Sequence, residues 1–212
     1  MSEIQAVLFD YGMVLSGPPD PKAWAEMKRL LGVASEERFH AAYWKFRDAY
    51  DRGELTGEGY WEAVAKELGE EAEVRELLDA DTMLWTQPNQ EMIDWAVALQ
   101  HGGWKTGILS NIGDAMELGV MARWPWMRGF THHTFSHRLR MAKPELAIYR
   151  HAAEGLGVPA EAVLFVDDRE ENIAAAREAG MKAVRYSSHE QFVADMQGSG
   201  WGELLSAPPQ KA

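Results

Sequence analysis

The feature that most constrains the fold occurs three times: a short apolar run ends in a polar side chain, and a helical pattern follows. The runs are AVLFD (6–10), TGILS (106–110) and AVLFVDD (162–168). Short apolar runs that alternate with helices of about 10–15 residues are typical of β-α-β units, whose strands lie parallel in one sheet. We therefore predict an α/β fold in which the three polar ends meet at one edge of the sheet.

A helical segment interrupts this alternation after the first strand. The sequence GPPDP (17–21) breaks regular structure, and helical patterns then fill the rest of the segment, one of them covering residues 35–53. We predict a three-layer, Rossmann-like parallel-sheet core formed by residues 1–16 and 87–212. A small all-helical cap domain, residues 17–86, is inserted after the first strand.

Composition excludes several classes of protein. The 212-residue chain has no cysteine, so disulfides, thiol catalysis and thiolate metal sites are ruled out. The net charge is −12, and no cluster of Lys and Arg marks a nucleic-acid-binding face. No signal-peptide pattern begins the sequence, and its apolar stretches are too short to span a bilayer. We expect a cytoplasmic protein that binds neither nucleic acid nor membrane, with monomer and homodimer both open.

The polar ends of the predicted strands carry a distinctive set of groups. Asp10, Ser110, Asp167 and Asp168 should lie together, and clustered carboxylates repel unless positive charge neutralises them. Mg²⁺, which prefers oxygen ligands, would supply that charge. Lys143, at the start of a later helical pattern, would supply more. A lysine beside an aspartate and a hydroxyl suits phosphoryl transfer, in which an aspartate oxygen attacks phosphorus.

These motifs, taken in order, resemble those of the haloacid dehalogenase superfamily. They are FDYGMVL around Asp10, ILSN around Ser110, AKPELAIY around Lys143 and FVDDREENIAAAREAG around the aspartate pair. The resemblance covers almost the whole chain and is greatest to a capped phosphatase branch, which contains sugar-1-phosphatases and the N-terminal phosphatase domain of soluble epoxide hydrolase. It implies Mg²⁺-dependent hydrolysis of a small phosphorylated metabolite, such as a sugar phosphate with a good leaving group.

The same resemblance implies which residues would handle the phosphate. Asp10 would be the nucleophile and would form an aspartyl-phosphate, which Lys143 would stabilise. Ser110 and the backbone amide of Asn111 would bind the phosphate oxygens.

The resemblance also implies a set of metal ligands. Mg²⁺ would be held by Asp10, by the backbone carbonyl of Gly12 and by Asp168. Asp167 would bind the metal directly or through water. Asn172 would support this loop from the first turn of the following helix.

Gly12 is a departure from the family pattern. Most phosphatases of the superfamily carry an aspartate at this position, which protonates the leaving oxygen and later activates water. General acid–base catalysis typically contributes about 10²–10⁴-fold, so we expect slow turnover weighted toward good leaving groups. Three substitutes remain open: a cap residue such as His40 or Glu54, a water molecule, or a leaving group acidic enough to need no proton.

Two other functions remain open. A 2-haloacid dehalogenase shares the fold and the aspartate nucleophile, but it needs no metal and would leave Asp167 and Asp168 unexplained. A non-catalytic member of the fold would bind a phosphorylated metabolite or a partner, and Gly12 favours this alternative.

Several further residues invite a functional interpretation. His132 and His133 fall on opposite faces of a β-like run, so we do not expect them to form a transition-metal site with His137. Arg138 and Arg140 are predicted in the loop before the lysine motif, where we favour pairing with solvated carboxylates over contact with substrate. The tryptophans are interpreted mainly as packing residues, although four in the predicted cap are candidates to line a pocket: Trp24, Trp44, Trp61 and Trp85.

Overall fold

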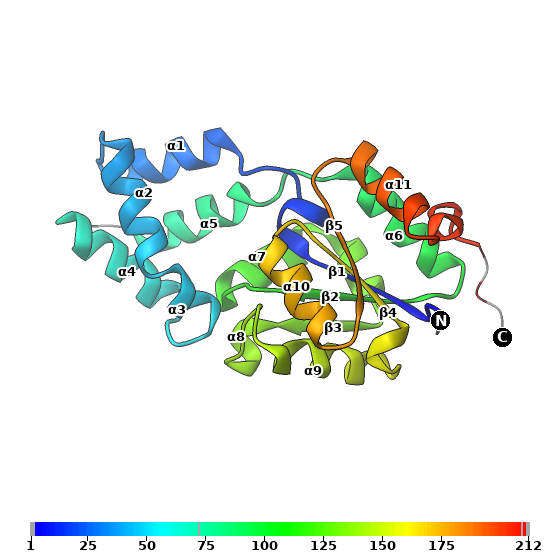
Figure 1. Ribbon diagram of the computed structural model, residues 1–212. Helices are drawn as coiled ribbons and strands as arrows, with labels where there is room; N and C mark the ends of the chain where they lie inside the picture. Colours follow the sequence, from blue (N-terminus) through cyan, green and yellow to red (C-terminus); the bar gives the residue numbers. More distant parts are fainter. Residues whose placement is uncertain (1–2, 72, 209, 211–212) are drawn as a thin grey trace.

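The computed structural model describes residues 3–71, 73–208 and 210. Five parallel strands form one sheet in the order β3-β2-β1-β4-β5, with β1 in the middle (Figure 1). The strands are β1 (Ala6–Phe9), β2 (Lys105–Ser110), β3 (His132–Phe135), β4 (Val163–Asp167) and β5 (Lys182–Arg185). Because all strands are parallel, their carboxyl ends lie at one edge, and the predicted α/β fold is confirmed.

Helices cover both faces of the sheet, as the alternation of side chains in β1 requires. Ala6 and Leu8 pack into one buried cluster, whereas Val7 and Phe9 pack into the other. The first cluster is closed by α9 (Leu146–Leu156) and α10 (Glu170–Glu178), and the second by α6 (Gln90–His101) and α11 (His189–Gly198). The fold therefore has three layers, with short helical turns at η2 (Pro125–Gly129), η3 (Ala160–Ala162) and η4 (Gly202–Ser206).

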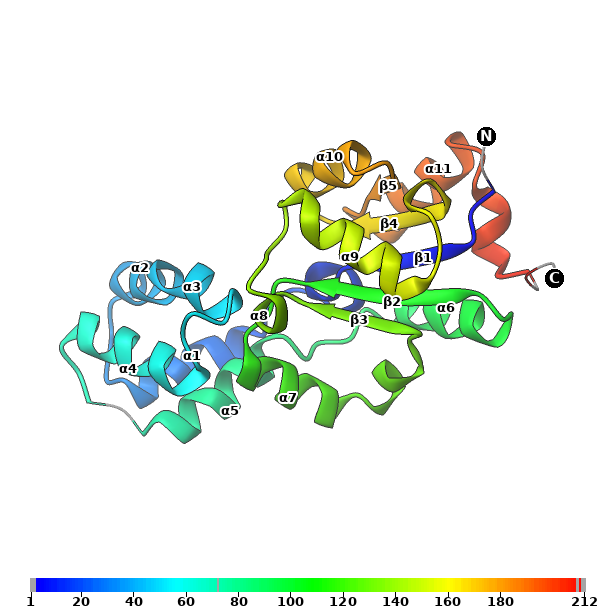
Figure 2. The same ribbon diagram turned by 90° about the horizontal axis from the view of Figure 1, so that it is seen from below.

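Five helices between β1 and α6 form a separate group, called here the insertion helices. They are α1 (Pro21–Leu30), α2 (Glu36–Lys45), α3 (Arg47–Asp51), α4 (Gly57–Leu68) and α5 (Val74–Leu84). The group lies beyond the carboxyl ends of the strands (Figure 2). Trp61, Tyr43 and Tyr60 are fully buried inside it, and they belong to the same hydrophobic cluster as Val7 and Phe9 of β1.

The starts of these helices follow from their sequence. The Ser35 hydroxyl accepts the amide of Arg38 (3.2 Å), and the Thr56 hydroxyl accepts the amide of Gly59 (3.1 Å). These side chains satisfy backbone donors that a helix leaves unpaired at its first turn. No helix in the described ranges combines the length and the apolar composition that a bilayer crossing demands.

The insertion helices are joined to the core through α7 (Asp114–Arg123), which packs against α4 and α5. The Asp114 carboxylate accepts the amide of Gly57 (2.9 Å), and the Tyr50 hydroxyl accepts the amide of Met116 (3.0 Å). A Cβ at Gly113 would lie 2.1 Å from the Tyr50 ring. Glycine at position 113 therefore allows the two parts to approach closely.

Two predicted elements have different boundaries. The helix predicted over residues 35–53 is divided at Phe46 (φ −108°, ψ 0°) into α2 and α3. The break lets Arg47 and Tyr50 turn inward, where they are 7% and 1% exposed. The prediction that Arg138 lies in a loop is wrong, because it belongs to the short helix α8 (Ser136–Leu139).

Candidate active site

Asp10 lies where β1 ends and the turn η1 (Tyr11–Leu15) begins. Its amide donates to the Val166 carbonyl of β4 (2.9 Å), and its carboxylate accepts the amide of Tyr11 (2.6 Å). The chain then turns away through an extended Gly12 (φ −64°, ψ 133°) and through Met13, whose φ is 61°. Asp10 is left 7% exposed beside the strand that carries the aspartate pair.

Lys143 joins two strand ends. Its Nζ lies 2.9 Å from Asp10 Oδ1 and 2.7 Å from Asp167 Oδ2. Asn111 fixes the lysine backbone, since its side chain accepts the Lys143 amide (2.8 Å) and donates to the Lys143 carbonyl (2.9 Å). Burial alone would lower the pKa of Lys143, but the carboxylates of Asp10 and Asp167 outweigh burial and raise it. The buried ammonium therefore stays charged.

Asp167 and Asp168 have different surroundings although they are neighbours. Asp167 is fully buried, and its Oδ1 accepts the amide of Arg169 (2.9 Å) and the Asn172 side chain (2.9 Å). Asp168 is partly exposed and lines the cavity described below. Asp167 therefore orients Lys143, and the Asp168 carboxylate is open to a ligand.

The carboxylates of Asp10, Asp167 and Asp168 each offer an oxygen within 4.8 Å of the others. Burial raises the pKa of Asp10 to about 8, with Lys143 opposing the shift and Asp167 adding to it. Burial, and next the charge of Asp167, also raises the pKa of Asp168. One ammonium thus faces three carboxylates, of which Asp10 and Asp167 are buried and Asp168 is partly exposed, and this leaves a deficit of positive charge. The all-oxygen donor set fits a hard divalent cation such as Mg²⁺.

One cavity of about 380 Å³ opens above these groups. Most residues predicted from the sequence lie around it: Asp10, Gly12, Ser110, Asn111, Lys143, Asp168 and Asn172. Asp167 is the one that lies behind the wall, where it holds Lys143. The strand ends of β1, β2 and β4 therefore do converge, as the sheet topology requires.

The opposite wall of the cavity comes from the insertion helices. Trp44, Arg47, Asp48 and Asp51 line it, together with Trp85 just after α5. Neither His40 nor Glu54 is among the lining residues, and both side chains are exposed. The sequence analysis missed the charged residues of this wall, because nothing in the sequence shows which turn of α3 faces the sheet.

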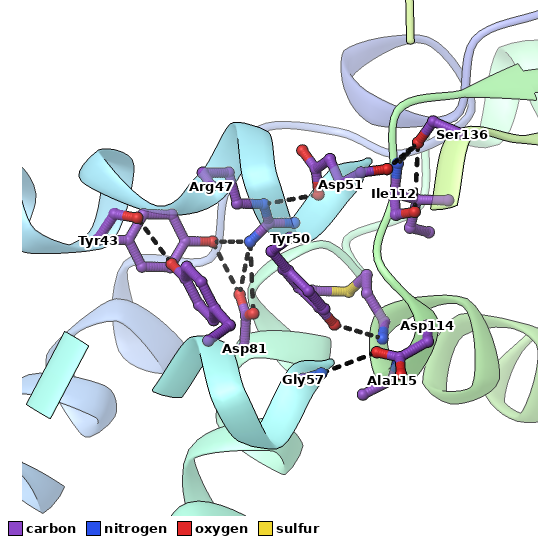
Figure 3. A network of polar contacts seen from close by, with 12 residues as sticks. Tyr43, Arg47, Tyr50, Asp51, Gly57, Asp81, Ile112, Asp114, Ala115 and Ser136 are labelled. Carbon is purple, nitrogen blue, oxygen red and sulfur yellow. Dashed lines mark hydrogen bonds and ion pairs between the residues drawn. The ribbon is translucent and has the colours of Figure 1, made fainter. Parts of the chain in front are cut away.

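Arg47 is the centre of a buried network (Figure 3). Its Nε donates to Asp51 Oδ1 (3.0 Å), and an NH group donates to the Tyr43 hydroxyl (2.6 Å) and lies 3.3 Å from Asp81 Oδ2. The Tyr43 hydroxyl in turn donates to Asp81 Oδ1 (2.8 Å). The guanidinium also lies over the rings of Tyr43 and Tyr50 at 5.4 and 5.3 Å from their centroids. The i, i+4 spacing of Arg47 and Asp51 is visible in the sequence, but the contact with α5 is not.

The remaining candidates have structural surroundings. His133 Nε2 lies 2.8 Å from the Met127 carbonyl, and His137 Nε2 lies 2.6 Å from Glu117. Among the described residues, no histidine belongs to a group that could hold a metal. Arg138 pairs with Glu117, which is 5% exposed, so the prediction of a solvated carboxylate is wrong for Arg138.

The four tryptophans of the insertion divide into two pairs. Trp44 and Trp85 line the cavity. Trp61 is fully buried among aromatic neighbours, and Trp24 donates its indole N–H to Glu36 (2.6 Å). The interpretation as packing residues therefore fits Trp61 and Trp24.

Comparison with known families gives one match over most of the chain. The model of the haloacid dehalogenase-like hydrolases matches residues 4–180. The chain belongs to this family of hydrolases. The resemblance drawn from the four motifs is thereby confirmed at the level of the superfamily, and the capped phosphatase branch stays a prediction.

Two curated relatives are each 27% identical to the chain. One, named drimenol cyclase, from Aspergillus calidoustus, matches over 199 residues, which cover 89% of this chain and 35% of the relative. The chain thus spans about a third of that relative. The other, named a phosphatase, from Mycobacterium tuberculosis, matches over 187 residues, which cover 85% of this chain and 86% of the relative.

Solved structures share the fold. A HAD family enzyme from Bacteroides thetaiotaomicron has a TM-score of 0.78 at 20% identity, covering 92% of this chain and 99% of that one. The same enzyme in complex with magnesium and inorganic phosphate has a TM-score of 0.73 at 21% identity, covering 88% and 96%. An L-2-haloacid dehalogenase from Xanthobacter autotrophicus has a TM-score of 0.66 at 21% identity, covering 99% and 90%.

Proposed function

We propose that the protein is a Mg²⁺-dependent phosphatase that hydrolyses a small phosphorylated metabolite through an aspartyl-phosphate on Asp10. One observation carries the proposal: a single buried ammonium, Lys143, faces three carboxylates at the base of a cavity. That arrangement suits a divalent cation and a phosphate together, because the cation balances the carboxylates while the lysine and the cation share the phosphate charge. The relative named a phosphatase and the structural neighbour solved with magnesium and phosphate support it.

In this proposal the chain's own groups act as follows. Asp10 attacks phosphorus through the carboxylate oxygen that does not contact Lys143, and the bond from phosphorus to the leaving oxygen breaks. The Ser110 hydroxyl and the Asn111 amide hold phosphate oxygens, and Lys143 keeps Asp10 oriented and stabilises its phosphorylated form. Water then attacks phosphorus, which releases phosphate and restores the Asp10 carboxylate.

The metal would be held by Asp10, the Gly12 carbonyl and Asp168, with Asp167 directly or through water. Bound there, Mg²⁺ would neutralise the phosphate oxygens and orient them for in-line attack. Asp10 and Asp168, whose carboxyl groups have a raised pKa, both belong to this ligand set. A bound cation favours the ionised form of each.

The cavity limits the class of substrate. A volume of about 380 Å³ lies near the lower end of the range for small-molecule sites, roughly 300–1,000 Å³. Its insertion wall presents Trp44 and Trp85 beside charged groups. A small metabolite with a polar body fits these surroundings, with the insertion helices acting as a cap over it.

The test is a panel of phosphorylated metabolites, together with para-nitrophenyl phosphate and acetyl phosphate, assayed with Mg²⁺ and with EDTA. We expect turnover with Mg²⁺ and none with EDTA. Asp10→Asn should abolish turnover, whereas Asp79→Asn, an exposed aspartate of α5 outside the cavity, should not change it. Turnover retained by Asp10→Asn would contradict the proposal.

A 2-haloacid dehalogenase is the alternative that the structural neighbour from Xanthobacter autotrophicus keeps in view. That chemistry also uses an aspartate nucleophile, but it gives no reason for Asp168 to stand beside Asp10 and Asp167. Turnover of chloroacetate in the presence of EDTA would support the dehalogenase and reject the phosphatase.

A non-catalytic binding protein is the other alternative, and Gly12 is the observation that favours it. Beryllofluoride with Mg²⁺ mimics a phosphorylated aspartate. We expect it to raise the melting temperature of the wild-type protein and not of Asp10→Asn. A protein that binds phosphorylated metabolites without turnover, and does not respond to beryllofluoride, would be a binding module.

A further inference from the structure

Asp51 presents a carboxyl group to the cavity from the side opposite Asp10. It ends α3 and lines the same cavity as Asp10 and Gly12. Its side chain is 16% exposed, and one oxygen accepts the Nε–H of Arg47 at 3.0 Å. The other oxygen has no hydrogen-bond partner within the described part of the chain and is turned away from the guanidinium (Figure 3). A carboxyl group in this position can exchange a proton with a bound substrate.

The charges around Arg47 determine where a proton resides. One guanidinium contacts two carboxyl groups, the largely buried Asp51 and the fully buried Asp81. The Asp81 carboxylate accepts hydrogen bonds from the Tyr43 hydroxyl and from Arg47, whereas the Asp51 side chain, among the residues that the structure describes, accepts from Arg47 alone. Two buried carboxylates beside one cation leave an uncompensated charge, and the group with fewer donors takes the proton more readily. Asp51 is that group.

The surroundings of Asp51 bring the pKa of its carboxyl group toward neutral pH. Burial raises the pKa of Asp51 to about 6, with Arg47 opposing the shift and Asp81 adding to it. The groups that act electrostatically on Asp51 are Arg47 and Asp48 on α3, Tyr60 on α4 and Asp81 on α5. The charged groups that line the same cavity from the sheet side are Asp10, Lys143, Asp168 and Arg169. A carboxyl group poised near neutral pH is suited to give and take a proton in one cycle.

We propose that Asp51 is the general acid and base of this enzyme, in place of the side chain that Gly12 lacks. This inference rests on the proposed phosphatase function. In the first step Asp10 attacks phosphorus, the bond to the leaving oxygen breaks, and the Asp51 proton passes to that oxygen to give the free alcohol. In the second step the Asp51 carboxylate takes a proton from water as the water oxygen attacks phosphorus. The bond from phosphorus to Asp10 then breaks, leaving phosphate and protonated Asp51.

The other acidic candidates of the insertion are placed less well. His40 and Glu54 do not line the cavity. Asp48 lines it, but its side chain is 79% exposed and pairs with Arg52 at 3.0 Å.

Position 12 itself has room for the missing group. Gly12 has φ −64° and ψ 133°, which any residue adopts, and a Cβ there would lie 3.9 Å from the Trp85 ring, an ordinary van der Waals contact. The fold therefore does not require glycine here. An aspartate introduced at position 12 would stand beside the proposed nucleophile, which provides a rescue experiment.

The experiment compares kcat/KM for a series of phosphate esters of falling leaving-group acidity: dinitrophenyl, para-nitrophenyl, phenyl and glycerol phosphate, all with Mg²⁺. We expect Asp51→Asn to retain most activity on dinitrophenyl phosphate and to lose about 10²–10⁴-fold on glycerol phosphate, because only the poor leaving group needs a proton. Asn keeps an oxygen that can accept the hydrogen bond from Arg47. Retained activity on the good leaving group shows that the variant is folded. The exposed Asp79→Asn is the control and should follow the wild type across the series.

The second arm is the double variant Gly12→Asp with Asp51→Asn. We expect it to recover activity on glycerol phosphate relative to Asp51→Asn alone. The proposal is overturned if Asp51→Asn loses activity equally across the series, which would indicate a structural role, or if Asp48→Asn produces the selective loss instead. If the wild type hydrolyses no member of the series, the phosphatase proposal itself fails. If the wild type hydrolyses the series and Asp51→Asn has the same kcat/KM on every member, the phosphatase proposal stands and only the role of Asp51 is rejected.

Discussion

Two buried clusters face each other across the cavity, and each is built around one cation. On the sheet side, Lys143 pairs with Asp10 and Asp167, with Asp168 beside them. On the insertion side, Arg47 pairs with Asp51 and Asp81.

The clusters differ in how they balance charge. The first leaves carboxylate oxygens directed at one point, where a divalent cation can bind. The second encloses its cation between tyrosine rings and a tyrosine hydroxyl, so a proton on a carboxyl group completes its balance. The difference teaches that an excess of carboxylates over cations can indicate a metal site in one place, with three carboxylates beside one cation, and a proton carrier in another, with two.

The largest effect is expected when the cation of each cluster, Lys143 or Arg47, is removed. Lys143→Met and Arg47→Met should each lower the free energy of unfolding by about 3–5 kcal/mol, because each leaves buried carboxylates without their partner. Mg²⁺ should restore part of the loss in Lys143→Met, where it can take over the charge, and none in Arg47→Met. Urea unfolding with and without Mg²⁺ measures both. Equal recovery in the two variants would show that the clusters do not differ in this way.

The sheet-side cluster was the predictable one. Asp10, Ser110 and the aspartate pair each follow a short apolar run, and parallel strands bring such ends together whatever the details of packing. Lys143 does not end a strand and was predicted from the need for positive charge beside the carboxylates, whereas Asn172 needed the family pattern. The strand ends and the ordered motifs thus predicted the polar groups around Lys143, but not lining residues such as Met116 and Arg169.

The insertion-side cluster could not be predicted, for a physical reason. Its members come from α2, α3 and α5, and their contact depends on the rotation of each helix and on the break at Phe46. Sequence periodicity indicates which face of a helix is apolar, but not which polar residue on a neighbouring helix it meets. The proposals of His40 and Glu54 came from position in the chain alone, and neither residue reaches the cavity.

A second test uses pH to examine the proton in the Arg47 cluster. The pKa of Asp51 is about 6 in the folded protein and about 3.8 in the unfolded chain. Between these values the folded state binds more protons, so stability falls as pH rises from about 4 to about 6, by up to about 3 kcal/mol. Asp51→Asn lacks this proton.

The free energy of unfolding of the wild type minus that of Asp51→Asn should therefore decrease across the window and stay constant above it. Asp79→Asn serves as the control, and denaturant unfolding at each pH is the measurement. Parallel curves for wild type and Asp51→Asn would show that Asp51 is already ionised at the low end of the window.

A third test concerns the close contact between Gly113 of the core and Tyr50 of the insertion helices. A Cβ at position 113 would lie 2.1 Å from the ring of Tyr50, which covers the Arg47 guanidinium. Gly113→Ala should therefore lower stability by about 1–3 kcal/mol. Gly12→Ala, whose Cβ would meet its nearest neighbour at 3.9 Å, should stay within about 0.5 kcal/mol of the wild type. Thermal unfolding of both variants compares them, and an equal loss would mean that the sheet side is packed as tightly as the insertion side.

The smallest expected effect comes from the arginine five residues after Arg47. Arg52 also bridges two carboxylates, Asp48 at 3.0 Å and Glu145 of the core, but those partners are 79% and 43% exposed. Ion pairs in water contribute about 0–1 kcal/mol, and salt screens them. Arg52→Gln should thus lower stability by less than about 1 kcal/mol, with the difference shrinking when urea unfolding is repeated at high salt. Each of the two arginines contacts two carboxylates, and they differ in their access to water. A loss of stability in Arg52→Gln as large as that in Arg47→Met would therefore contradict the argument from burial.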